Sequence, residues 1–200
     1  PAVGQDIFVT NTTDENDNAS PISLRDAIVQ ANASGIDNRI LLPNGSSHLL
    51  TLGNLPIVTG TDVGGALSII CTGTTNAIID GATFFRPLTM TSGSNLSLSK
   101  ITIQNGSANH GGAIYNKYGD LSISECLITQ NKATAGNGGG IYSRSNKAVA
   151  VLIQNSTLSF NSSSEYSCVL MQQVNSQSSR TSSFFTLKGA YVLLSECNST

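Results

Sequence analysis

The sequence GGAIYN at residues 111–116 returns as GGGIYS at residues 138–143. Each copy follows an alternating apolar segment that ends in asparagine, LSLSKITIQN at 96–105 and LSISECLITQN at 121–131. A third such segment, VLIQNSTLSFN, occupies residues 151–161 and has no glycine pair behind it. A repeat of about 26 to 30 residues is typical of proteins in which one structural unit stacks on the next.

Each repeat is predicted to form one coil of a right-handed parallel β-helix (β-solenoid) with three short strands, so the predicted fold class is all-β. Adjacent coils then lie about 4.8 Å apart, the ordinary spacing of paired strands. Alternate Leu and Ile side chains point into the lumen, while Ser and Thr point outward. Because no single coil buries its own apolar face, each depends on its neighbours for stability.

The repeated residues outside the apolar positions have separate predicted roles. Asparagines at one corner tolerate left-handed backbone angles, and their stacked amides can form a hydrogen-bonded ladder. Glycine pairs allow a tight corner that a Cβ would block. Tyrosines after the glycine pairs are expected to stack on successive coils, with a carbohydrate-binding stripe as the alternative. These residues are Asn105, Asn131, Asn161, Gly111, Gly112, Gly138, Gly139, Tyr115 and Tyr142.

An amphipathic helix is predicted ahead of the first coil. Ser23 can act as its N-cap, with Asp26 three residues later as the acidic partner of a capping box. Apolar residues then recur at helical spacing and give one face, which we expect to cap the N-terminal end of the coil. The residues of that face are Leu24, Ala27, Ile28 and Ala31, and Asn32 and Gly35 supply the stop.

The chain is predicted to form one β-helix domain over residues 1–200. Residues 1–39 would contain an N-terminal strand, a loop and the capping helix. Residues 40–161 would form the coils, including a short strand over Leu55–Val58. Residues 162–200 depart from the repeat and are interpreted as an irregular C-terminal coil or an assembly segment.

Composition limits the possible functions. Charged residues make up 11% of the chain, Trp is absent and the formal net charge is −2. Nucleic acid is excluded as a partner because the ten Lys and Arg are scattered and form no basic stripe. No run approaches the roughly 18 apolar residues of a membrane span. Because the chain begins at Pro1, a targeting peptide is expected to have been removed.

The four cysteines show no C-x-x-C spacing of a zinc or redox site. Cys168 and Cys197 lie about one coil apart, so a disulfide between them is a testable hypothesis. Cys126 is expected to fill the lumen as a small apolar residue. Asn-x-Ser/Thr sequences are candidate glycosylation positions if the host glycosylates secreted proteins, and these include Asn11, Asn95, Asn155 and Asn198.

Two sets of motifs resemble known families. The segment ISLRDAI at 22–28 looks like the CSLREA-type N-terminal signature of bacterial surface β-helix proteins, with Ile22 in place of Cys and Asp26 in place of Glu. The GGAI at 111–114 is similar to the GGAI repeat of chlamydial polymorphic membrane proteins. Their FxxN repeat resembles Ile128-x-x-Asn131 and Leu158-x-x-Asn161, where aliphatics replace Phe. The resemblance covers roughly residues 7 to 161 and implies a right-handed β-helix on a secreted or cell-surface protein.

The residues favour an extracellular, non-catalytic structural or adhesive solenoid, with end-to-end self-assembly through unpaired strand edges as one version. Its partner would be another copy, a surface carbohydrate or a receptor. The rival class is a carbohydrate-active enzyme similar to a polysaccharide lyase, which needs acidic ligands for Ca²⁺ and a Lys or Arg near the sugar C5 proton. The nearest candidates follow no coil period, so no catalytic residue is assigned, and they are Asp80, Lys100, Lys117 and Asp120.

The polar loop Asp14–Asn18 offers oxygen ligands to Ca²⁺, but it lacks the glycine and the closing glutamate of an EF-hand loop. A solvated loop is therefore the favoured interpretation, and no metal or cofactor is assigned. His48 and His110 are too far apart in the chain to suggest a metal-binding pair.

Overall fold

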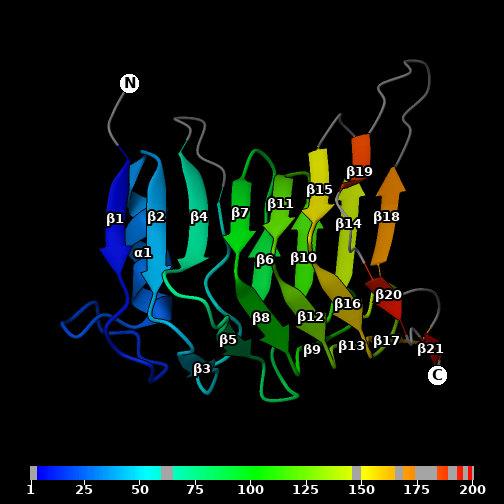
Figure 1. Ribbon diagram of the computed structural model, residues 1–200, viewed down its shortest axis with the longest axis horizontal. Helices are drawn as coiled ribbons and strands as arrows, with labels where there is room; N and C mark the ends of the chain where they lie inside the picture. Colours follow the sequence, from blue (N-terminus) through cyan, green and yellow to red (C-terminus); the bar gives the residue numbers. More distant parts are fainter. Residues whose placement is uncertain are drawn as a thin grey trace.

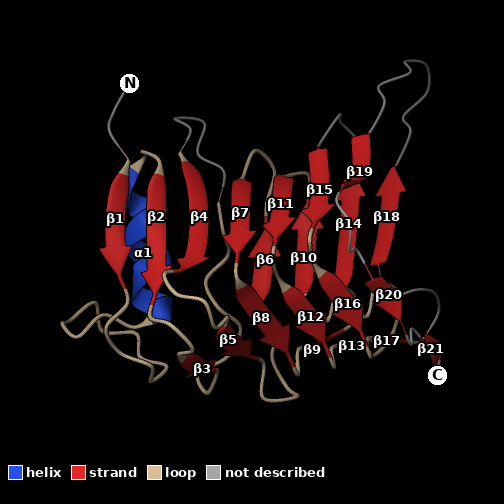
Figure 2. Ribbon diagram, in the orientation of Figure 1, coloured by secondary structure: helices blue, strands red, loops and turns tan. Residues whose placement is uncertain are grey.

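The computed structural model describes residues 4–59, 65–145, 150–164, 169–173, 184–188, 193–195 and 198–199. Within these residues the strands lie parallel in four sheets that wrap around one elongated apolar core (Figure 1). The one helix of the described part lies at the N-terminal end (Figure 2). The predicted all-β parallel β-helix with a short N-terminal helix is confirmed.

The sheets are named A to D, and neighbouring strands within each are parallel. Sheet A contains β1 (Gln5–Phe8), β2 (Asn38–Leu42), β4 (Ala66–Cys71), β7 (Asn95–Ser99), β11 (Asp120–Ser124), β15 (Ala150–Gln154) and β19 (Phe184–Lys188). Sheet B contains β3 (Ser47–Leu49), β5 (Ala77–Asp80), β8 (Ile101–Gln104), β12 (Leu127–Thr129), β16 (Thr157–Ser159) and β20 (Leu193–Ser195). Sheet C contains β6 (Leu88–Met90), β10 (Ile114–Lys117), β14 (Ile141–Ser145) and β18 (Val169–Gln173). Sheet D contains β9 (Ser107–Ala108), β13 (Lys132–Ala133), β17 (Ser162–Ser163) and β21 (Asn198–Ser199).

In a complete coil the chain passes through sheets A, B, D and C in that order. The strands β7, β8, β9 and β10 form one such coil. The expectation of three strands per coil is therefore wrong, because sheet D adds a fourth strand of two residues. Its register sets Ser107, Lys132 and Ser162 side by side. A two-residue strand is too short to produce an alternating pattern, which is why the sequence gives no sign of it.

The lumen is filled by columns of apolar side chains from the three longer sheets. In sheet A, Leu96, Leu121 and Val151 are neighbours in register, and none is more than 4% exposed. Sheets B and C contribute Ile128 and Ile141, which are fully buried. Burial of one such side chain stabilises a fold by about 1.5–3 kcal/mol, so the stacked coils supply their own core.

The helix α1 (Leu24–Ser34) lies against the first coil, beside β1 and β2 (Figure 1). Ser23 is its N-cap, because the Asp26 backbone N–H donates to Ser23 Oγ at 3.1 Å. The Ser23 hydroxyl in turn lies 2.8 Å from Asp26 Oδ2, and Gly35 ends the helix with a φ of 68°. The apolar face turned to the coil consists of Leu24, Ala27, Ile28 and Ala31, all buried.

The predicted strand over Leu55–Val58 does not form. Its last residue makes a single parallel bridge with Met90 of sheet C. On the other side the segment meets α1 instead of a strand, so it has no second ladder to join.

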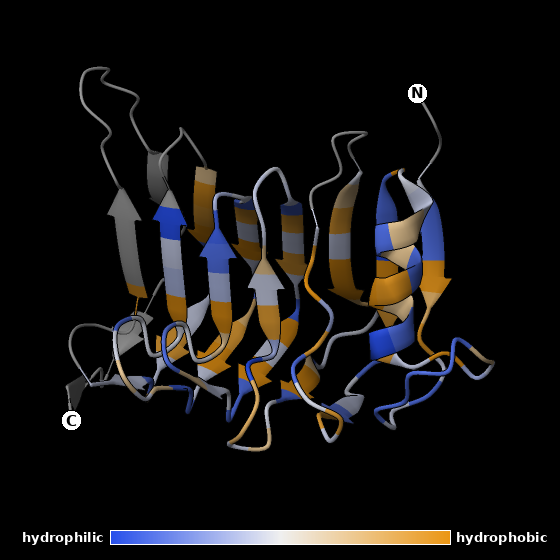
Figure 3. Ribbon diagram, turned by 180° about the vertical axis from the view of Figure 1, so that it is seen from behind, coloured by the Kyte–Doolittle hydropathy of each residue, from blue (hydrophilic) through white to orange (hydrophobic). Residues whose placement is uncertain are grey.

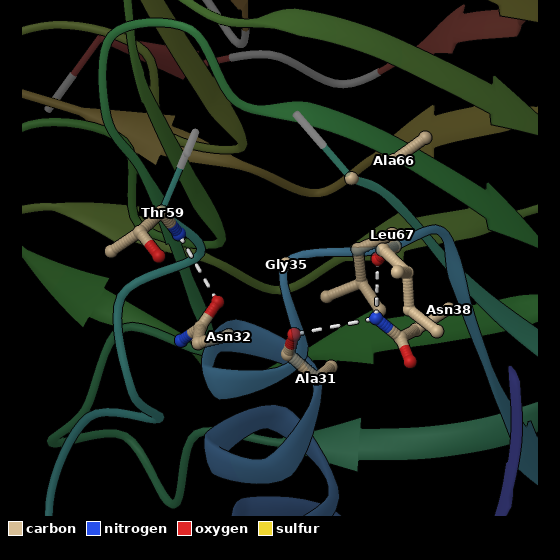
Figure 4. Close-up of a pocket in the computed structure, with 9 residues that line it drawn as sticks. Ala31, Asn32, Gly35, Asn38, Thr59, Ala66 and Leu67 are labelled. Atoms are coloured by element: carbon tan, nitrogen blue, oxygen red, sulfur yellow. Dashed lines mark hydrogen bonds between the residues drawn. The ribbon is translucent and has the colours of Figure 1, made fainter. Parts of the chain in front are cut away.

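The Asn32 side chain takes the place of that missing strand (Figure 4). Its Nδ2 donates to Ile57 O at 2.8 Å, and its Oδ1 accepts from the Thr59 backbone N–H at 3.3 Å. Beside it, Asn38 Nδ2 donates to Ala31 O at the end of the helix. A cavity of about 10 Å³ remains between these groups, which is about the smallest that can hold one water. The C-terminal end of α1 thus satisfies the backbone at this coil edge.

Candidate functional site

Two buried asparagines form a hydrogen-bonded column at the corner between sheets B and D. Asn131 Nδ2 donates to Asn161 Oδ1 at 2.9 Å, and the Asn131 backbone N–H donates to the same oxygen at 3.1 Å. One coil earlier, the Gly106 backbone N–H donates to Asn131 Oδ1 at 2.7 Å. Each buried amide therefore joins one coil to the next, which is the ladder expected of stacked asparagines.

Asn105 does not belong to this column, and the expectation that it does is wrong. The strand register places Gly106 beside Asn131 and Asn105 beside Gln130. The left-handed backbone angle also belongs to this neighbouring position, with φ of 53° at Asn105, 57° at Gln130 and 52° at Phe160. The two roles predicted for one asparagine are therefore divided between consecutive residues of the corner.

The glycine pairs form the corner between sheets D and C. Gly111 and Gly138 adopt φ of 59° and 70°, a backbone conformation that residues with a Cβ rarely take. A Cβ on Gly112 would lie 2.4 Å from Gly139 O, and one on Gly139 would lie 2.3 Å from Ser162 O. Backbone from sheet D approaches too closely here for any other residue.

Tyr115 and Tyr142 stack on the outer face of sheet C, with ring centroids 5.4 Å apart and an interplanar angle of 17°. The Arg86 guanidinium carbon lies 5.0 Å from the Tyr115 centroid, and the His110 ring lies 5.0 Å from that of Tyr142. Burial is the main cause that raises the pKa of Tyr142 and lowers that of Arg86. Since neighbouring rings and a cation cover these faces, the geometry favours structural stacking over open aromatic platforms.

The four residues considered for a lyase are not brought together. Asp80 ends a strand of sheet B, and its Oδ2 accepts from two amide side chains of the next coil. Asp120 begins a strand of sheet A, where its Oδ1 accepts from the Ala150 backbone N–H at 2.7 Å. Lys117 ends a strand of sheet C, and Lys100 lies at the corner between sheets A and B. Each occupies a different part of the coil.

The N-terminal loop holds a buried ion pair between Asp14 and Arg25. Arg25 Nε lies 2.7 Å from Asp14 Oδ1, and Nη2 lies 2.9 Å from Oδ2. Arg25 also donates to Gly53 O at 2.9 Å and to Asn54 O at 2.7 Å. Asp14 Oδ2 accepts from the backbone N–H groups of the two residues that follow Leu50, at 2.7 and 2.8 Å. The pair therefore satisfies the open backbone of residues 51–54.

This arrangement gives Asp14 a structural role in the loop Asp14–Asn18. Burial tends to raise the pKa of Asp14, but the Arg25 guanidinium and two backbone N–H groups outweigh it, so the pKa is lowered overall. The carboxylate is already neutralised, and the Asp17 carboxylate accepts from the Ala19 backbone N–H. Among the described residues, no three His, Cys, Asp or Glu side chains gather in a way that could hold a metal ion. The loop serves the fold through Asp14.

The two histidines lie in separate environments. His48 is 3% exposed, its Nε2 lies 2.9 Å from Ser46 Oγ, and burial lowers its pKa to about 4. His110 Nδ1 instead accepts from the Asn137 backbone N–H at 3.1 Å on the tyrosine face.

The cysteine and glycosylation candidates are placed as follows. Cys126 is buried in the lumen with a free thiol, and burial raises its pKa to about 11. Asn95 and Asn155 are exposed, whereas the Asn11 amide donates to Glu15 Oε2 at 2.7 Å. Two of the predicted positions, Cys168 and Cys197, lie outside the described residues, as does the side chain of Asn198.

A stacked parallel β-helix with an asparagine ladder defines the chain as a β-solenoid of repeated coils. Residues 125–144 match the sequence family described as the Chlamydia polymorphic membrane protein (Chlamydia_PMP) repeat. Neither curated proteins nor solved structures give a significant match. The match and the fold together agree with the predicted resemblance and indicate a surface-type β-helix repeat protein. Within the described residues, no helix is long and apolar enough to cross a membrane.

The matched segment contains β12, β13 and β14 of one coil. Its Ile128 and Ile141 fill the lumen, Asn131 belongs to the buried column, and Gly138 and Gly139 form the tight corner. The characteristic residues of the repeat therefore build the coil, and they leave the outer faces of the sheets to other residues.

Sequence reasoning missed the contacts of three residues that organise the surface and the end of the solenoid. Arg25 and Asn32 close the first coil, and Arg86 covers the tyrosine stack. Arg25 gave one usable signal, since it is a charged residue directly beside the apolar positions of the helix. Asn54, Ile57 and Tyr115, which these residues contact, are distant from them in the sequence, so no local pattern reveals the contacts.

The asparagine column leads to a prediction that compares neighbouring corner positions. Asn131→Gln should lower the free energy of unfolding by about 1–3 kcal/mol, because a longer side chain displaces the buried amide from its partners. Asn105→Gln is the control and should change it by less than about 1 kcal/mol, since Gln130 already occupies the equivalent position and only the hydrogen bond to Asp80 is at stake. Urea unfolding of both variants measures the difference, and equal losses would contradict the assigned register.

The Asp14–Arg25 pair leads to a prediction about pH. Because the folded pKa of Asp14 lies below its ordinary value of 3.8, its stabilisation is complete above that value. The stabilisation is lost as the pH falls through the folded pKa. Asp14→Asn should lower the free energy of unfolding by about 3 kcal/mol at pH 7. The difference in unfolding free energy between this variant and the wild type should narrow below about pH 4.

Urea unfolding at neutral and acidic pH measures this difference for Asp14→Asn and for the control Asp17→Asn. Asp17 is exposed, so its variant should stay within about 0.5 kcal/mol of the wild type at neutral pH. If the loss of unfolding free energy for Asp14→Asn stayed constant with pH, the carboxylate charge would not be what stabilises the backbone of residues 51–54.

Proposed function

We propose that this chain is part of a surface-exposed, non-catalytic β-solenoid with a structural and adhesive role. The observation that carries the proposal is the use of the repeat residues. Each characteristic residue of the matched segment packs the lumen, joins coils or forms a corner. Such a solenoid is a rigid support whose outer faces are free to contact a partner.

The positions of the acidic and basic side chains support the non-catalytic part of the proposal. General acid–base chemistry on a sugar needs a proton donor or acceptor and a stabilising charge within hydrogen-bond reach of one bound ring. Asp80, Asp120 and Lys117 lie in three different sheets, and both carboxylates already accept hydrogen bonds from the protein. The rival lyase function would require these residues to converge.

Two measurements test this proposal. Incubation with acidic polysaccharides should give no rise in the ultraviolet absorbance of unsaturated sugar products, with a known lyase as positive control. Beads coated with the folded protein should be retained on some surfaces of a panel of matrix proteins and neutral and acidic glycans, and beads coated with unfolded protein should not. Cleavage of an acidic polysaccharide, or no bead retention on any surface of the panel, would overturn the proposal.

Self-association through the coil ends is the finer part of the proposal. At the N-terminal end, α1, Asn32 and the Asp14–Arg25 pair occupy the backbone groups of the first coils. At the other end of the described part, β18, β19, β20 and β21 each have a strand neighbour on one side. An unpaired strand edge is a template for further pairing. Electron microscopy at high protein concentration should reveal end-to-end rods, and uniformly single particles would contradict this part.

A further inference from the structure

One pair of stacked side chains departs from the neutral pattern of the solenoid. The register of β10 and β14 places Lys117 directly beside Arg144. Strands in register are about 4.8 Å apart, and like charges directly opposite are destabilising. Among the strand pairings of the described residues, this is the one pair of like charges. By contrast, Arg39 lies beside Asp6 and forms an ion pair with it.

Neither cation of this pair has an acidic partner in the described part of the chain. The ion pairs found there are Arg25–Asp14 and Arg39–Asp6. Lys117 is exposed, and Arg144 Nε is buried without a hydrogen-bond partner. Asp120, three residues after Lys117, accepts a hydrogen bond from Ala150 instead. Within the described residues, the repulsion between the two cations is thus not relieved by an acidic side chain.

The two cations continue a face that already carries the tyrosine stack. Tyr115 and Tyr142 precede them by two residues on the same strands, so both pairs point to the same side of sheet C, about 7 Å apart along the strands. The back view of the solenoid shows hydrophilic ends on β10 and β14, next to one another (Figure 3). Arg86, over the Tyr115 ring, adds a third positive charge to the face.

We propose that this outer face of sheet C binds an acidic polysaccharide. Carboxylate or sulfate groups of the chain would bridge Lys117 and Arg144, because a guanidinium forms paired hydrogen bonds with such anions. The sugar ring would lie against the side chain of Tyr115, which is partly exposed. A bound anion across both cations removes their repulsion, which is the charge complementarity that commits the occupant.

An acidic sugar fits this strip better than an acidic peptide or a lipid headgroup. The aromatic and cationic columns run side by side along the solenoid axis, so the occupant needs apolar surface beside a fixed anion. A uronate or sulfated sugar carries both on one rigid ring. The inference rests on the proposed adhesive function and names its partner class.

The experiment measures binding of the folded protein to dextran sulfate and polygalacturonate, with neutral dextran and polyglutamate as comparison polymers. Lys117→Gln combined with Arg144→Gln should weaken binding to an acidic polysaccharide about tenfold, and added salt should weaken the wild-type binding. Dextran sulfate and polygalacturonate separate sulfate from carboxylate recognition. Lys100→Gln combined with Lys132→Gln removes the same charge from other faces and should change binding less than about twofold.

Folding of the variants is checked by thermal unfolding. Removal of two facing cations should not lower the unfolding temperature, because it removes a repulsion. Lys117→Glu is the second variant: it changes one exposed residue, should pair with Arg144, and should abolish polysaccharide binding while the protein stays folded.

Four results would overturn the inference. They are no binding to either acidic polysaccharide, equal weakening by both double variants, no effect of Lys117→Glu, and equally tight binding of polyglutamate. In each of these cases, retention of beads on other surfaces would leave the adhesive function standing. Turnover of the bound polysaccharide would instead overturn the non-catalytic function.

Discussion

The structure depends on parallel stacking of the coils in register. This stacking makes each outward residue a neighbour of its equivalent on the next coil, about 4.8 Å away. A side chain therefore has to be compatible with a copy of its own kind. Aliphatic residues meet this condition in the lumen and Ser does so outside, as Ser97 beside Ser122 illustrates. Amides meet it by donating and accepting at once, as Asn131 and Asn161 do. Repeated charges do not, which accounts for a chain in which only 11% of the residues are charged.

At the first coil of the described part, the terminal strands of the sheets have a strand neighbour on one side only, so their other backbone edge needs different partners. Side chains supply the hydrogen bonds that the backbone of a neighbouring strand would otherwise make. Asn32 supplies one donor and one acceptor, as a peptide unit of a neighbouring strand would, and the Asp14–Arg25 pair supplies several more. The cost of burying this ion pair is offset because both partners have their remaining hydrogen bonds satisfied. The helix is thus required for its polar groups as much as for its apolar face.

The sequence contained enough information for the coil but not for every register. The lumen residues, the glycine corners and the helix follow from periodicity, and each has its predicted place. Alignment of the repeats on the strand-ending Asn places Asn105 beside Asn131, which is wrong by one residue. Alignment on Ile103 and Ile128, which are neighbours in the lumen, gives the register of the structure. The Asp14–Arg25 contact could not be predicted, because the two lie in a loop and a helix without any periodic relation.

These features separate the residues that make the solenoid from those that distinguish its faces. A repeat match of 20 residues, 125–144, contains mostly the first kind, so it defines the architecture without specifying a ligand. Specificity must then come from outward columns that are not needed for packing. Stacking disfavours like charges in such columns, so the juxtaposition of Lys117 and Arg144 works against the stability of the coil. The proposed acidic polysaccharide would pair with both cations and so relieve the repulsion on strands that are otherwise neutral.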